Sequence, residues 1–143
     1  MSSLYVESEY PDQQITGLII ASAYEVHRVF GFGFLESVYK RALAVEIRYR
    51  GAKVGREVRF DLDHRDQDVG IYKADILVDD RIIVEVKTGK LPDPQAPTQL
   101  INYLCASQLS LGLVLDFCTE LHIKRIISTP EQRTWRRRAS RKS

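Results

Sequence analysis

The sequence predicts a single α/β domain in which a mixed β-sheet is flanked by helices, in the order ααβββαββ. Two segments whose apolar residues recur at helical spacing come first, and segments with strand-like alternation follow them. Later in the chain, Leu111–Phe117 is almost entirely apolar, which is typical of a strand buried on both faces. Apolar residues make up 44% of the 143 residues, enough for one real core.

The first two elements are predicted to be helices. Residues 12–30 place apolar side chains three and four positions apart, and residues 35–50 repeat this pattern. Gly31-Phe32-Gly33 separates the two segments, because glycine tolerates the backbone angles of a sharp turn. Gly51 is a suitable stop for the second helix.

Strands and one further helix complete the predicted order. Alternation of apolar and charged residues over positions 54–62 predicts a half-exposed strand, and a turn follows it. The segment 90–97 contains three prolines and is expected to be a loop. The remaining expected elements are strands at 69–78 and 82–87, a short helix at 98–107, and strands at 111–117 and 121–127.

Two of these strands carry charge where a buried strand should have none. Asp75 interrupts the first, and Glu85 and Lys87 interrupt the second. Because side chains alternate along a strand, Glu85 and Lys87 share one face. Two carboxylates and a lysine on a half-buried sheet are costly unless something binds between them.

The length of the connection decides whether the two acids meet. A two-residue turn would place Asp75 opposite Val84 and mix polar with apolar residues on both faces. A three-residue loop at 79–81 places Asp75 opposite Glu85, about 5 Å apart at Cβ. We predict the second register because it gathers the apolar residues on one face. These residues are Ala74, Ile76, Val78, Ile82, Val84 and Val86.

Such a pair of acids suits a hard divalent cation. Mg²⁺ prefers oxygen ligands and takes one or two carboxylates, so Asp75, Glu85 and the Val86 carbonyl are candidate ligands. Lys87 could polarise an attacking water and stabilise developing negative charge, or could offset the two acids as a salt-bridge partner. The alternative for the acids is an exposed hairpin on which they face water.

These residues carry a family resemblance. Asp75 with Glu85-Val-Lys87 resembles the D…(D/E)xK signature of the PD-(D/E)XK nuclease superfamily. Gly33-Phe-Leu-Glu36-Ser-Val-Tyr39 is similar to the signature of its small GxxExxY-type family. Gln99 and Tyr103 match the QxxxY element of RecB-like and Cas4-like members. The order and spacing of these elements agree over roughly residues 13–127.

The resemblance implies a restriction-endonuclease-like core and a Mg²⁺- or Mn²⁺-dependent nuclease, with DNA as the expected substrate. A second possibility is a nuclease-fold protein that binds nucleic acid or a partner protein without cutting. In similar families the acid at Glu36 approaches the metal from the helix side, although an acid is favourable near a helix N-terminus anyway. Gln99 and Tyr103 are implied to orient the water, the lysine or a substrate phosphate. Alternatively, Gln99 is exposed, and Tyr103 and Tyr39 are packing residues.

Three positions concern histidine and the glycine turn. His27 is a weak candidate for the extra histidine ligand of RecB-like nucleases, since a lone histidine at a helix end is more often a cap or surface residue. Related proteins often carry a histidine three residues before the glutamine, where this chain has Ala96. Their glycine turn often reads Gly-Pro-Gly, and here Phe32 takes the middle position.

The net charge of +2 is unevenly distributed. Residues 131–143 hold six of the 21 Lys and Arg but one of the 19 Asp and Glu, which leaves 15 basic and 18 acidic residues elsewhere. We therefore expect a domain at 12–130 between a flexible arm, residues 1–11, and a basic tail. Either the tail contacts nucleic acid through Arg136, Arg137 and Arg138, or it is a disordered solubilising end.

The composition also predicts the compartment. Cys105 and Cys118 have no metal-ligand spacing and are expected to be buried, reduced thiols. The acidic N-terminus shows no secretory signal, and no apolar run approaches the length of a membrane span. These features predict a cytoplasmic protein without a membrane partner.

Overall fold

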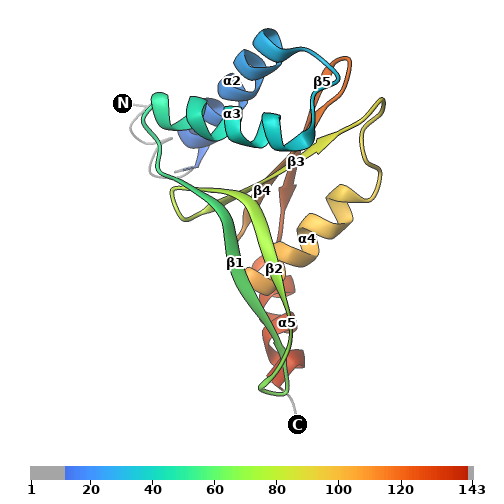
Figure 1. Cartoon of the computed structure of the whole chain (residues 1–143). Helices are drawn as coiled ribbons and strands as arrows, with labels where there is room; N and C mark the ends of the chain where they lie inside the picture. Colours follow the sequence, from blue (N-terminus) through green and yellow to red (C-terminus); the bar gives the residue numbers. More distant parts are fainter. Residues whose placement is uncertain (1–11, 142–143) are drawn as a thin grey trace.

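The computed structural model describes residues 12–141, with side chains to residue 137 (Figure 1). The predicted arm, residues 1–11, lies outside the described residues. The order ααβββαββ is confirmed, and a helix follows it. The elements are α2 (Gln13–Phe30), α3 (Glu36–Tyr49), β1 (Val54–His64), β2 (Gln67–Val78), β3 (Ile82–Thr88), α4 (Ala96–Ser107), β4 (Leu111–Phe117), β5 (Leu121–Ile127) and α5 (Pro130–Arg141).

The strands form one five-stranded mixed sheet in the order β1-β2-β3-β4-β5. β3 and β4 are parallel, and every other neighbouring pair is antiparallel. A parallel pair needs a crossover, and α4 supplies it between β3 and β4. The predicted mixed sheet flanked by helices is therefore confirmed.

Helices cover both faces of the sheet. α2 and α3 lie together over one face, and the long β1–β2 hairpin extends away from them (Figure 1). Their apolar residues form one core with alternate residues of β2, β3 and β4, among them Ile76, Val84 and Leu113. α4 forms a second core on the opposite face with residues such as Ile83 and Val114. This double coverage explains why every residue of β4 is buried.

The β2–β3 hairpin has the predicted register. Val78 pairs with Ile82 and Ile76 pairs with Val84. Asp79 and Asp80 adopt left-handed φ angles of 51° and 58° in the connecting loop. The expected apolar set of Ile76, Val78, Ile82, Val84 and Val86 is buried in the core beneath α2 and α3.

Ala74, which the sequence groups with these residues, lies on the opposite face. Ala74 packs in the core beneath α4, whereas Ile76 packs beneath α2 and α3. The alternation along β2 changes phase at Asp75. The β1–β2 ladder has pairs on both sides of this point but not at Asp75 itself, and the facing residue of β1, Glu57, has a φ of 50°. Strict alternation fails where the ladder is interrupted at Asp75, opposite the left-handed Glu57.

α4 lies unusually close to β4. A Cβ added at Gly112 would stand 2.8 Å from Leu100 Cδ2 and 3.1 Å from the Ile83 carbonyl oxygen, so a larger residue here would force Leu100 of the helix to shift. The helix begins at Ala96, slightly earlier than predicted, because Pro97 is compatible with a first helical turn. The absence of a side chain at Gly112 allows α4 to lie close to β3 and β4.

The basic C-terminal segment is helical. The Arg133 guanidinium donates hydrogen bonds to the Ser128 carbonyl and hydroxyl oxygens (2.6 and 2.7 Å), and Arg136 donates to Asn102 Oδ1 on α4 (3.2 Å). The disordered end that was one alternative is therefore not what residues 130–141 form. Arg137 is exposed, and the side chain of Arg138 lies outside the described residues. None of the helices in residues 12–141 combines the length and apolar character that crossing a bilayer requires.

Candidate active site

Asp75 and Glu85 meet where β2 and β3 diverge. The last ladder pair is Ile76 with Val84, and beyond it side chains take over the bonding between the strands. Asp75 Oδ2 accepts a hydrogen bond from the Val86 amide (2.8 Å), and the Asp75 amide donates to Glu85 Oε2 (3.4 Å). Each carboxylate is thus fixed by the other acid's strand, and Asp75 is only 9% exposed.

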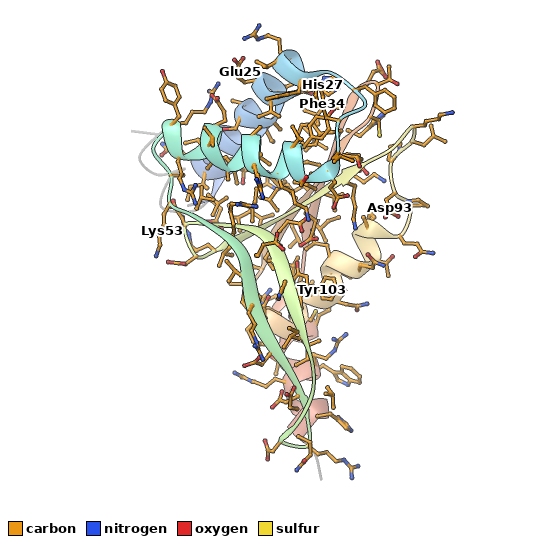
Figure 2. All side chains as sticks on the ribbon, viewed as in Figure 1. Glu25, His27, Phe34, Lys53, Asp93 and Tyr103 are labelled. Atoms are coloured by element: carbon orange, nitrogen blue, oxygen red, sulfur yellow. The ribbon has the colours of Figure 1, made fainter. Side chains whose placement is uncertain are left out.

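A stacked tyrosine pair supports Glu85. The Tyr72 hydroxyl donates a hydrogen bond to Glu85 Oε2. The Tyr72 ring stacks on Tyr103 of α4, with ring centroids 3.7 Å apart and planes 7° apart. Tyr103, labelled in Figure 2, therefore reaches the site through Tyr72 and combines the packing role with a position near the acids. Gln99 lies one turn earlier on α4 and is exposed, so its role stays a prediction.

Burial governs the protonation of Glu85. Burial, followed by the negative charge of Asp75, raises the pKa of Glu85 to about 7, although the hydrogen bonds from Tyr72 and the Asp75 amide and the charge of Lys87 oppose the rise. Burial, followed by the charge of Glu85, also raises the pKa of Tyr72, so its hydroxyl remains a donor. The metal-free site therefore resists holding two ionised carboxylates.

Lys40 of α3 was missed by sequence reasoning. Its Nζ lies 3.0 Å from Asp75 Oδ1 and 3.3 Å from Glu36 Oε2. Burial lowers the pKa of Lys40, but the hydrogen bond and charge of Asp75, together with Glu36, outweigh burial and raise it. The available signal was the four-residue spacing from Glu36, which places both side chains on one helix face.

Tyr72 was also missed, for a different reason. It stands three residues before Asp75, so strict alternation assigns the two side chains to opposite faces. The phase change at Asp75 brings Tyr72 to the face of Glu85 and Ile83 instead. No pattern within β2 indicates this change.

The predicted helix-side residues take three positions. Glu36 is the first residue of α3, has a side chain that is 40% exposed, and is joined to Asp75 through Lys40. Tyr39 is buried, donates to the Gly31 carbonyl (2.6 Å) and stacks on Phe117, so it is a packing residue that closes the glycine turn. In contrast, His27 Nε2 forms a hydrogen bond with the Cys118 carbonyl oxygen (2.9 Å) at the β4–β5 turn.

A third acid lies beside Lys87. The parallel ladder pairs Lys87 with Asp116, and paired residues of neighbouring strands share a face. Asp116 is 1% exposed, and its Oδ1 accepts a hydrogen bond from the Asp93 amide in the loop before α4 (3.0 Å). Its Oδ2 is buried without a hydrogen-bond partner among the residues that the structure describes. The signal in the sequence was a single acid within an otherwise apolar strand.

The acids suit a hard cation in chemistry and in position. Asp75 and Glu85 supply carboxylate oxygens side by side, and the Lys40 ammonium already sits as a cation on Asp75 and Glu36. As the side chains stand, no three His, Cys, Asp or Glu residues within 12–141 converge closely enough to hold a metal ion. The acids therefore fit the cation as a pair, with Glu36 held by the lysine.

Comparison with known proteins identifies the superfamily of this chain. The family model described as the PD-(D/E)XK nuclease superfamily matches residues 13–126. A solved structure titled "Crystal structure of SSO0001" is similar to this chain with a TM-score of 0.50 and 19% sequence identity, a likeness of fold alone. The match covers 94% of this chain and 65% of that chain. No curated protein matches.

Proposed function

This chain belongs to the PD-(D/E)XK nuclease superfamily, and from that premise we propose that it is a divalent-metal-dependent nuclease that hydrolyses phosphodiester bonds. Within the superfamily we assign it to the GxxExxY-type family on Gly33, Glu36 and Tyr39. The proposal includes Mg²⁺ or Mn²⁺ as the cofactor, DNA as the substrate and the cytoplasm as the location.

One observation carries the proposal. Asp75 and Glu85, which lie ten residues apart in the chain, are brought side by side at the point where β2 and β3 separate. A binding module for nucleic acid has no need of two half-buried acids, because acids repel phosphate and cost stability. Burial and the charge of Asp75 raise the pKa of Glu85, and a bound cation would favour its ionised form.

Asp75, Glu85 and the Val86 carbonyl would hold the metal, with Glu36 as a further ligand. The metal would supply positive charge that stabilises the scissile phosphate, and it would lower the pKa of a bound water so that this water can act as the nucleophile. The Tyr72 hydroxyl orients Glu85, and the stacked Tyr103 fixes the Tyr72 ring.

Lys87 is the residue that would act on the attacking water and on the phosphate. It follows Glu85 on the same face of β3, so its ammonium can hold the attacking water and stabilise the charge that develops on the phosphate. Asp116, its neighbour on β4, lies on the same side and can orient it. Gln99 would contact the water or a substrate phosphate from α4. Arg136, Arg137 and Arg138 of α5 would contact the nucleic-acid backbone outside the site.

The proposal is tested by measuring single-turnover cleavage and metal affinity on the same variants. Asp75→Asn and Glu85→Gln should weaken metal binding and cleavage together, because each removes a charged ligand. Lys87→Ala should keep metal binding but lower the cleavage rate on the order of a hundredfold or more, because a preorganised cation is lost. Gln99→Ala should give a milder loss with metal binding intact.

Lys53→Ala is the matched control for Lys87→Ala. Lys53 pairs with Asp80 at the β2–β3 turn, so its loss removes a cation without touching the acids. Linear, circular and single-stranded DNA and RNA should be offered with and without Mn²⁺. If the wild type cuts none of these substrates with metal present, the protein is instead a nuclease-fold protein that binds nucleic acid or a partner without cutting. If Lys87→Ala cleaves at the wild-type rate, Lys87 acts only as a counter-ion to the acids.

A further inference from the structure

The position of Lys40 distinguishes it from an ordinary surface lysine. Its side chain is 19% exposed, whereas that of Lys53, which pairs with Asp80, is 72% exposed. Its Nζ contacts two acids from different elements, Asp75 of β2 at 3.0 Å and Glu36 of α3 at 3.3 Å. It therefore joins α3 to the sheet at the site itself.

The contacts of Asp75 leave little room for another cation. Oδ2 is engaged by the Val86 amide and Oδ1 by the Lys40 ammonium. A divalent ion on Asp75 would have to lie within one carboxylate's width of the ammonium, where the two positive charges repel strongly in a half-buried site. The ammonium also holds Glu36, so that acid cannot turn toward Glu85 while the contact lasts.

We propose that Lys40 is a built-in competitor for the metal site, and that a divalent cation binds by displacing its ammonium from Asp75 and Glu36. This inference rests on the proposed metal-dependent function. In the metal-free protein the lysine neutralises the acids and holds α3 against β2. When the metal binds, it replaces that charge, and Glu36 is released to approach the cation.

The first test is calorimetric titration of metal-free protein with Mn²⁺. Lys40→Met should bind Mn²⁺ about tenfold more tightly than the wild type, because a charge-assisted contact no longer has to be broken. The matched control is Arg50→Met, directly after the last residue of the same helix. Arg50 pairs with Glu46 of α3 four residues before it (2.8 Å), so this variant also removes one cation and one i,i+4 ion pair. Its affinity for Mn²⁺ should equal that of the wild type.

The second test uses the wild-type protein, so it holds even if Lys40→Met does not fold. Pulse labelling of lysine amines with acetic anhydride, read by mass spectrometry, should modify Lys40 several-fold faster once Mn²⁺ is present. Lys53 serves as the internal control, because its partner Asp80 lies at the β2–β3 turn and not in the site. Its labelling should not change with metal.

Each result of these two tests either supports or overturns the displacement of Lys40 by the metal. Equal or weaker Mn²⁺ binding by Lys40→Met, or Lys40 labelling that metal leaves unchanged or slows, overturns the displacement. In both cases the wild type still binds the metal, so the proposed function stands and Lys40 is a fixed structural cation. If neither the wild type nor Lys40→Met binds Mn²⁺, the proposed function and this inference fail together. Binding by Lys40→Met alone would support the competition in its strongest form.

Discussion

Replacing Glu85 by glutamine should change how the stability of the metal-free protein depends on pH. Burial, with the charge of Asp75, raises the pKa of Glu85 from its ordinary 4.5 to about 7. Below pH 4.5 the carboxyl is protonated in the folded and unfolded states alike. Between these two values the folded protein keeps a proton that the unfolded chain releases, so the free energy of unfolding falls as the pH rises through this window.

The magnitude follows from the two pKa values. Each pKa unit corresponds to about 1.36 kcal/mol, so the stability that Glu85 contributes below pH 4.5 is on the order of 3 kcal/mol and is lost above about pH 7. Glutamine is neutral at every pH and can still accept the Tyr72 hydrogen bond through its amide oxygen. The variant should therefore gain stability relative to the wild type by about 2–3 kcal/mol between pH 5 and pH 8.

Urea unfolding at several pH values, with a chelator present, measures this difference. The difference between the two proteins cancels the titration of the groups that lie far from Glu85, because those groups are shared and do not interact with it. Glu120→Gln is the control, since Glu120 is exposed in the β4–β5 turn and its loss should leave the pH profile parallel to that of the wild type. Parallel profiles for Glu85→Gln and the wild type would refute the claim that burial of this carboxyl costs stability.

Three further variants test the contacts around the site. Gly112→Ala should destabilise the protein by about 1–3 kcal/mol in urea unfolding, because its Cβ would press on α4, whereas Gly17→Ala, with open space in α2, should be neutral or stabilising. Asp116→Ala should cost about 1–3 kcal/mol because the Asp93 amide loses its acceptor, and Asp116→Asn should cost less; equal losses would contradict this. Arg136→Gln should lower the slope of log affinity for DNA against log salt by about one in fluorescence anisotropy, and an unchanged slope would remove this arginine from the interface.

The local sequence pattern was sufficient to predict the features that depend on hydrophobic period and on loop length. The apolar run Leu111–Phe117 identified a strand buried on both faces, because only helices on both sides of a sheet make that composition stable. The register of the β2–β3 hairpin also followed from the sequence. A slip of one residue would move every side chain to the other face, so only one loop length gathers the apolar residues. That register was enough to place Asp75 beside Glu85.

The surroundings of those acids were decided only by the tertiary structure. The change of phase at Asp75 moves Ala74 and Tyr72 to the face of Glu85. It arises where the β1–β2 ladder is interrupted opposite Glu57, which no alternation along one strand can indicate. Lys40 and Asp116 reach the site from α3 and β4, whose distance from β2 and β3 is set by packing across the core. The hydrophobic period and the residue spacing in a sequence describe the neighbours of a residue along its own helix or strand. Contacts between elements depend on how the helices pack on the twisted sheet. These contacts determine which charged groups surround Asp75 and Glu85.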